Sequence, residues 1–251
     1  MHAKYLKLAG DYFLMDNFLR RKQDTLSRKD KSSKGDWDEK ILKLCDKINL
    51  NENYYTTSSC SGRIVLMINQ DKKAERLFLK IWHDLISFEE LKKELGKILH
   101  SQVRDIDGSS QALSGLSQKN LINERKKFNL DDKLNPQNFI TNSKKFATKG
   151  ASNNNIKFKQ ESVIIHVACK TFEDAKKFLL KSQRAGFKRS GIISSGKRFV
   201  VECISTEKLE FPIINNGKLI VDNEFLKIVV GKANENLEKG WGKIERLGKS
   251  L

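Results

Sequence analysis

One short segment concentrates small polar side chains of the kind that bind ligands. Residues 56–61 are six consecutive hydroxyl or thiol residues, and Gly62 and Arg63 follow them. Side chains this small fill little of a core, and a glycine lets a turn expose several backbone N–H groups. Such a turn beside an arginine suits a phosphate or a carboxylate. The alternative is a strand connection that is simply rich in turn-forming residues.

The cysteines do not have the spacing of a metal or disulfide site. The four thiols lie far apart, without a CxxC pair, and three of them sit in apolar runs where a thiol usually packs. We therefore predict neither a metal nor a disulfide framework. Cys60 beside Arg63 leaves a Cys60-dependent hydrolase or transferase open as an alternative. The cysteines are Cys45, Cys60, Cys169 and Cys203.

The charge of the chain is strongly basic. Forty-eight Lys and Arg residues against 31 Asp and Glu residues give a formal net charge of +17. A polyanionic partner is the usual reason for such an excess, and we favour nucleic acid over a merely well-solvated lysine-rich surface. Residues 20–34 hold seven basic residues against Asp24 and Asp30, which fits contacts to RNA phosphates.

Neither a membrane span nor a signal peptide is predicted. No stretch approaches the ~18 consecutive apolar residues of a membrane helix, and residues 1–10 lack the apolar run of a signal peptide. We expect a cytoplasmic protein that does not contact a membrane.

The residues around the small-residue segment follow helix and strand patterns in alternation. Asp36 and Glu39 have the spacing of a capping box for a helix over about 37–48, and Ser87 with Glu90 caps a second helix. Runs rich in β-branched, aromatic or alternating apolar residues predict strands between these helices. The predicted strands are 54–58, 63–69 and 76–82.

The second half of the chain also alternates predicted strands and helices. A strand over 163–169 precedes a helix that opens at Thr171 and stops at Gly186. Strands over 190–193 and 198–204 follow, then strand-like segments around Asn216-Gly217 and a helical period after Asp222 that reaches the end. The fold class is therefore α+β, a hairpin-rich mixed sheet with flanking helices. The two halves leave a structural pseudo-repeat open, although no residue-level repeat supports it.

The middle of the chain has a different composition. From about 101 to 156 it is dominated by Ser, Asn, Gln, Gly and charged residues without a sustained apolar period. We predict one domain over 1–251 that carries a flexible insertion at about 101–156.

Several motifs occur in a fixed order along the chain. They are DKSSKGDWDEKI at 30–41, Ile48-Asn49, TTSSCSGRI at 56–64, Trp82-His83, IIHV at 164–167, AGFKRSGI at 185–192, KRFVVECIST at 197–206 and Ala233-Asn234. This set closely resembles the signature of the tRNA wybutosine-synthesizing protein 3 family, archaeal members included, over roughly 18–92 and 157–248. The chain departs from the family at Glu161-Ser162, in place of an acidic-Pro step, and at Asp84-Leu85, in place of Arg-Pro. Both departures concern local substrate contacts.

The resemblance implies a transferase that uses S-adenosyl-L-methionine. The methyl acceptor would be N4 of a demethylated wyosine-type tricyclic guanosine derivative, 3′ of the anticodon in tRNA(Phe), in wybutosine biosynthesis. The partner would be the tRNA(Phe) anticodon loop. This cofactor assignment rests on the resemblance alone, because no G-x-G-x-x-G motif follows a predicted strand.

The same resemblance gives candidate site residues. Lys34 and Arg63 would bind the methionine carboxylate or a tRNA phosphate, and Asp38 an amino group or a ribose hydroxyl. The other candidates line the base or cofactor pocket, with Ser190 and Gly191 as the opposing wall. The full set of binding candidates is Lys34, Asp38, Thr57, Ser58, Ser59, Cys60, Ser61, Gly62, Arg63, Ser190 and Gly191.

Two histidines receive different interpretations. His83 is the candidate catalytic base, because an ordinary histidine is available in its neutral form near neutral pH, although a strand-end role is an alternative. His166 lies mid-strand among apolar residues and is interpreted as a satisfied core histidine. A noncatalytic basic RNA-binding module is the alternative function, and the sequence does not give the oligomeric state.

Overall fold

The computed structural model describes residues 17–27, 38–69, 78–108, 155–196 and 198–251, with residues 101–108 described as helix only. The chain divides into two compact units that interleave along the sequence. Unit 1 comprises 1–62, 162–207 and 238–251, and unit 2 comprises 63–161 and 208–237. These units do not coincide with the two sequence halves, and the single-domain description stays a prediction.

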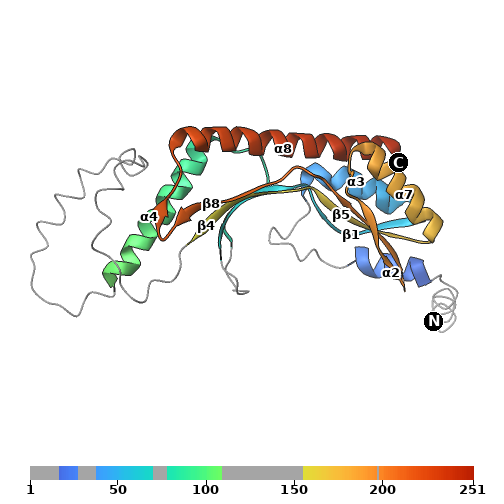
Figure 1. Ribbon diagram of the computed structural model, residues 1–251. Coiled ribbons are helices and arrows are strands. Elements are labelled where there is room, and N and C mark those ends of the chain that lie inside the picture. Colours follow the sequence, from blue (N-terminus) through green and yellow to red (C-terminus); the bar gives the residue numbers. More distant parts are fainter. Residues whose placement is uncertain (1–16, 28–37, 70–77, 109–154, 197) are drawn as a thin grey trace, which may run out of the picture. The chain divides into compact units, whose positions relative to one another are not determined.

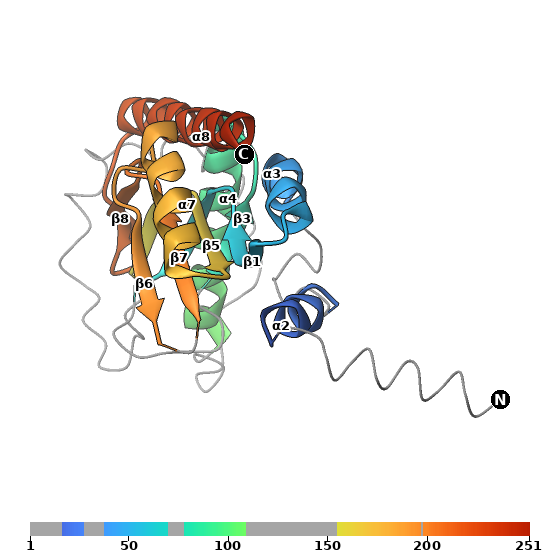
Figure 2. The same ribbon diagram turned by 90° about the vertical axis from the view of Figure 1, so that its right-hand side faces the viewer.

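Unit 1 is built on a four-stranded antiparallel sheet, here called sheet A. Its order is β1 (Tyr54–Cys60), β5 (Ile164–Cys169), β7 (Phe199–Ile204) and β6 (Gly191–Ser195). Alternate residues of the strands, such as Ile165, Val167 and Val201, join a buried core with α3 (Glu39–Leu50) and α7 (Phe172–Ala185). Figures 1 and 2 show both helices on the same face of this sheet. Its other face meets α2 (Asn17–Leu26) where the Phe18 and Tyr55 rings pack 5.2 Å apart.

Local capping signals explain where the helices of unit 1 begin and end. Thr171 caps α7, and Gly186 ends it in the left-handed conformation at φ 112°, as the sequence predicts. The capping prediction for α3 is wrong by two residues. Asp38, not Asp36, is the N-cap, because its side chain accepts a hydrogen bond from the Lys40 N–H.

Unit 2 is built on a five-stranded antiparallel sheet, here called sheet B. Its order is β3 (Phe78–Trp82), β2 (Arg63–Ile68), β4 (Ile156–Glu161), β8 (Leu209–Asn215) and β9 (Lys218–Leu219). Positive φ angles at Asn216 and Gly217 close the β8–β9 hairpin at the predicted turn. The unit also holds α4 (Phe88–Gly108), capped by Ser87 and Glu90 as predicted, and the first part of α8 (Asn223–Ser250).

The predicted α+β class with hairpins and flanking helices is confirmed, but the described strands form two antiparallel sheets instead of one mixed sheet. The flexible insertion at about 101–156 stays a prediction, and the structure describes regular elements only at its two ends. Helix α4 continues to Gly108, and β4 begins at Ile156 with a fully buried side chain. The remainder, 109–154, lies outside the described residues.

Candidate functional site

The segment of small residues is a strand and not the predicted anion-binding turn. Strand β1 continues to Cys60, and Ser58, Ser59 and Cys60 pair in register with His166, Ile165 and Ile164. Only Ser61 and Gly62 connect β1 to β2, and Gly62 has a positive φ of 89° that favours glycine. The side chains of this segment are therefore displayed by a sheet.

A bulge in β1 decides which way Ser58 points. Thr56 is opposite Val167, whereas Ser58 is opposite His166, so one extra residue stands between them. Thr56 turns toward α3, where its N–H and hydroxyl both donate to Asn49 Oδ1, at 2.8 and 3.1 Å. In a regular strand Ser58 would share that face, since side chains alternate with a period of two. The bulge turns Ser58 to the opposite face.

On that opposite face three side chains form a row across three neighbouring strands. Ser58 Oγ lies 2.7 Å from His166 Nδ1, and His166 Nε2 lies 2.9 Å from Glu202 Oε2. Ser58 is exposed, and the side chains of His166 and Glu202 keep 23% and 29% of their surface. The interpretation of His166 as a satisfied core residue is wrong, because it faces away from the core between a hydroxyl and a carboxylate.

The row of Ser58, His166 and Glu202 leads toward the fourth strand, β6, which carries the predicted site residue Gly191. Gly191 on β6 is in register with Glu202, and a Cβ added there would meet no atom of the described residues within 4 Å. Space therefore lies beside Glu202. Ser58 and Gly191, two predicted site residues, thus share one face of sheet A, and His166 and Glu202 are the residues between them that the sequence analysis missed. A signal was present, since each interrupts an apolar strand with a polar residue.

Several other predicted residues have structural partners. The buried Ser61 donates from its hydroxyl and its N–H to Asp38 Oδ2, and its carbonyl accepts from Trp241 Nε1 at 3.1 Å. Ser59 accepts from the Cys45 thiol at 3.5 Å, and the N–H and hydroxyl of Ser190 both donate to the Phe187 carbonyl. These contacts fasten β1 to α3 and hold the turn before β6.

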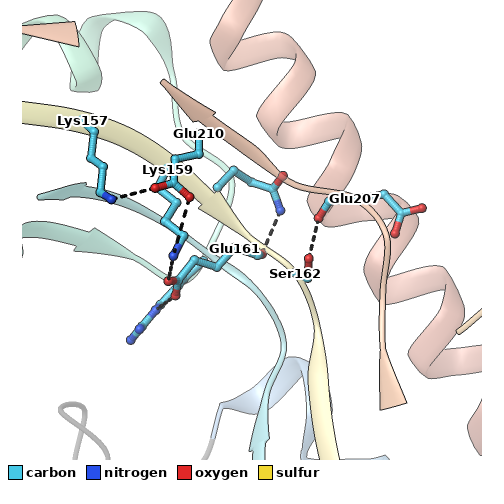
Figure 3. A network of polar contacts seen from close by, with 8 residues as sticks. Lys157, Lys159, Glu161, Ser162, Glu207 and Glu210 are labelled. Atoms are coloured by element: carbon cyan, nitrogen blue, oxygen red, sulfur yellow. Dashed lines mark hydrogen bonds and ion pairs between the residues drawn. The ribbon is translucent and has the colours of Figure 1, made fainter. Parts of the chain in front are cut away.

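Arg63 lies in unit 2, where it belongs to a ladder of ion pairs on sheet B. Its Nε donates to Glu161, and its guanidinium lies 5.0 Å from the Phe78 ring centroid. Figure 3 shows Lys159 reaching Glu161 and Lys157 reaching Glu210, at 3.0 and 2.6 Å. Burial alone would raise the pKa of Glu161, but hydrogen bonds from Arg63 and Lys159 outweigh it and lower the pKa. The acidic residue of the Glu161-Ser162 step thus supplies a partner for Arg63.

His83 also lies in unit 2, directly after β3. It is partly buried, and the loop that carries it is held by Asn234, whose side chain accepts from the Ile86 N–H at 3.1 Å and donates to the Ile86 carbonyl at 2.8 Å. The Ala233-Asn234 motif therefore shapes this loop. Lys34 lies outside the described residues.

Three of the four thiols are buried in unit 1. Burial raises the pKa of Cys45 and Cys203 to about 11 and that of Cys169 to about 12, which disfavours the reactive thiolate. Within the described ranges no group of three His, Cys, Asp or Glu side chains could hold a metal ion. None of the described helices has both the length and the apolar character that membrane crossing requires.

Comparison with known proteins agrees with the motif pattern. The family model described as Methyltransferase TYW3 matches residues 19–251. A relative in Methanocaldococcus jannaschii, named tRNA(Phe) 7-((3-amino-3-carboxypropyl)-4-demethylwyosine(37)-N(4))-methyltransferase, is 32% identical over 206 residues, 80% of this chain and 79% of the relative. A Danio rerio relative, named tRNA wybutosine-synthesizing protein 3 homolog, is 26% identical and covers 94% of this chain and 75% of its own.

A solved structure of a Pyrococcus horikoshii protein is similar as well. Its TM-score is 0.65 at 28% identity, and the match covers 93% of both chains. The family match defines the class of the protein as a methyltransferase. The chain belongs to the Methyltransferase TYW3 family.

Proposed function

We propose that this chain transfers a methyl group from S-adenosyl-L-methionine to N4 of a demethylated wyosine-type base 3′ of the anticodon in tRNA(Phe). The observation that carries the proposal is the family match over 19–251, which spans both units. The archaeal relative named above acts, by its name, on N4 of a demethylwyosine at position 37 of tRNA(Phe). A cytoplasmic location, where the tRNA would be modified, belongs to the same proposal.

The reaction makes two physical demands on the protein. The acceptor nitrogen has to meet the methyl carbon in line with the breaking carbon–sulfur bond, so alignment supplies much of the rate. The acceptor also loses its proton, so a group that accepts protons should stand nearby. When bound, the donor supplies an electrophilic methyl group on a sulfonium cation.

The face of sheet A that carries Ser58 fits these demands. The Ser58 hydroxyl is exposed and can hydrogen-bond to an acceptor base. The space at Gly191 leaves room beside Glu202. Cys60 lies on the same face as Ser58, and a ring nitrogen with its own lone pair needs no thiol adduct.

The basic residues suit the polyanionic substrate. Arg20 and Arg21 are exposed on α2, which packs against the Tyr55 end of the same sheet face. We propose that α2 binds backbone phosphates near the anticodon loop. The contributions of Lys34, Arg63 and His83 to the donor, the tRNA and proton transfer stay predictions.

Two measurements test the proposed function against a noncatalytic RNA-binding module. Calorimetry should detect binding of S-adenosyl-L-methionine, and a labelled methyl group should pass to tRNA(Phe) that carries the demethylated base. An RNA-binding module would bind tRNA without either result.

Arg63→Ala tests the predicted binding role of this arginine. If its guanidinium also contacts a ligand carboxylate or phosphate, affinity for that ligand should fall by about ten- to a hundredfold. Glu161→Gln is the matched control, because it removes the carboxylate partner and keeps the arginine. Equal losses in both variants would mean that Arg63 acts only through its ion pair with Glu161.

A further inference from the structure

We propose that Ser58, His166 and Glu202 form the proton-accepting relay of the methyl transfer, in place of His83. This inference rests on the proposed function and names the residues that receive the acceptor's proton. The three side chains come from β1, β5 and β7, and 108 positions separate Ser58 from His166 in the sequence. Their row becomes visible only once the sheet is formed.

The hydrogen bonds define what each member can do. With its proton on Nε2, His166 donates to Glu202 and accepts from the Ser58 hydroxyl, at 2.9 and 2.7 Å. The oxygen of Ser58 then keeps lone pairs for a substrate N–H, and Ser58 is the exposed end of the row. Glu202 holds the imidazole in this orientation.

The arrangement of the backbone argues against a hydrolase built on the same three residue types. In α/β-hydrolases the serine nucleophile sits on a sharp strand-to-helix turn, and backbone N–H groups near it are free to bind an oxyanion. Ser58 instead lies inside a strand that is paired with β5, one residue after a bulge. The row is suited to moving a proton, which is what methylation of a ring nitrogen requires.

The acceptor nitrogen forms a bond to the methyl carbon as the carbon–sulfur bond breaks, and the electron pair of that bond stays on sulfur. The proton of the acceptor nitrogen passes to Ser58 Oγ while the hydroxyl proton of Ser58 passes to His166 Nδ1. The positive charge of the sulfonium is thereby replaced by an imidazolium next to the Glu202 carboxylate.

The catalytic residue in this scheme is Ser58, and His166 and Glu202 are positioning and proton-storing residues that act through it. Single-turnover methylation at saturating donor and tRNA measures their contribution. His166→Gln should slow this step at least ~100-fold, the usual range for a lost general base, and should leave donor and tRNA affinities within a few-fold of wild type. A purely structural residue would reduce affinities and thermal stability together with the rate.

Glu202→Gln is the second variant, because it keeps a hydrogen-bonding side chain and removes the carboxylate that contacts His166 Nε2. We expect a slowing of about tenfold or more. If His166→Gln does not fold, the methylation rate of Glu202→Gln is the test of the relay. His100→Gln is the matched control, since His100 is exposed on α4.

The outcomes separate this inference from the proposed function. If the wild-type protein does not methylate the tRNA base, the proposed function fails. If the wild-type protein does methylate the base and folded His166→Gln does so at the wild-type rate, the relay is wrong. If His166→Gln does not fold, a wild-type rate of folded Glu202→Gln has the same meaning. If only His83→Gln slows methylation, His83 is the proton acceptor, as the sequence analysis predicted.

Discussion

The two sheets place their polar side chains in different ways. On sheet B, Lys157, Lys159 and Arg63 each have a carboxylate partner, and Lys159 and Arg63 share Glu161, so the ion pairs of the ladder fix its members in place. On sheet A, the row from Glu202 through His166 ends at the exposed hydroxyl of Ser58. The ladder is suited to holding strands together, and the row is suited to passing a proton outward. We therefore place the chemistry on sheet A.

The largest expected effect is a loss of stability when helix α8 packs less well against the residue before β5 of sheet A. A Cβ at Gly240 would lie 2.7 Å from Val163 Cγ2, one residue before the strand that carries His166. Gly240→Ala should therefore lower the free energy of unfolding by up to about 3 kcal/mol, measured by denaturant titration. Gly231→Ala is the control, since its Cβ meets nothing within 4 Å, and it should be neutral or stabilising by about 0.5–1 kcal/mol. Equal stability of the two variants would contradict this packing.

The second prediction concerns the loop that carries His83. Asn234→Ala removes both hydrogen bonds to Ile86 and should destabilise the protein by about 1–2 kcal/mol in thermal or denaturant unfolding. Lys232→Ala, an exposed change on the same helix, should stay within about 0.5 kcal/mol. If the methylation rate of Asn234→Ala falls far more than its loss of stability explains, unit 2 takes part in the chemistry. The assignment of the chemistry to sheet A alone would then be wrong.

The smallest expected effect is the pH dependence of the sheet B ladder. The pKa of Glu161 is lowered in the folded protein, so its contribution to stability is present above the unfolded pKa and is lost as pH falls through the folded pKa. Unfolding measured between neutral pH and the acid range should show a shallower loss of stability in Glu161→Gln than in wild type. Glu173→Gln, at a 69% exposed side chain, should follow the wild-type curve. The same slope in all three proteins would mean that the ladder contributes nothing.

The sequence predicted the parts of the fold that local chemistry determines. The Ser87 and Glu90 cap, the Thr171 cap and the Gly186 stop are set by residues within a few positions of each other, and all are confirmed. Strand β4 was missed, although Ile156, Phe158 and Gln160 alternate as buried positions, because it directly follows a segment without apolar period.

The candidate site was only partly predictable for a related reason. Ser58 and Gly191 could be selected from the motifs, but the bulge that turns Ser58 toward His166 is visible only in the register of β1 against β5. His166 and Glu202 are brought together by strand pairing between distant segments, which periodicity within one strand does not reveal. The anion-binding turn was wrong for the same reason, since pairing with β5 extends β1 through Cys60.

One measurement tests the central claim most directly. Purified protein is incubated with labelled S-adenosyl-L-methionine and tRNA(Phe) that carries the demethylated tricyclic base, and the nucleosides are then separated and analysed by mass spectrometry with fragmentation. We expect one added labelled methyl group, located on N4 of the tricyclic base, with wild-type protein and with His100→Gln, and very little with His166→Gln. Unmodified base after incubation with folded wild-type protein that binds both substrates would contradict it.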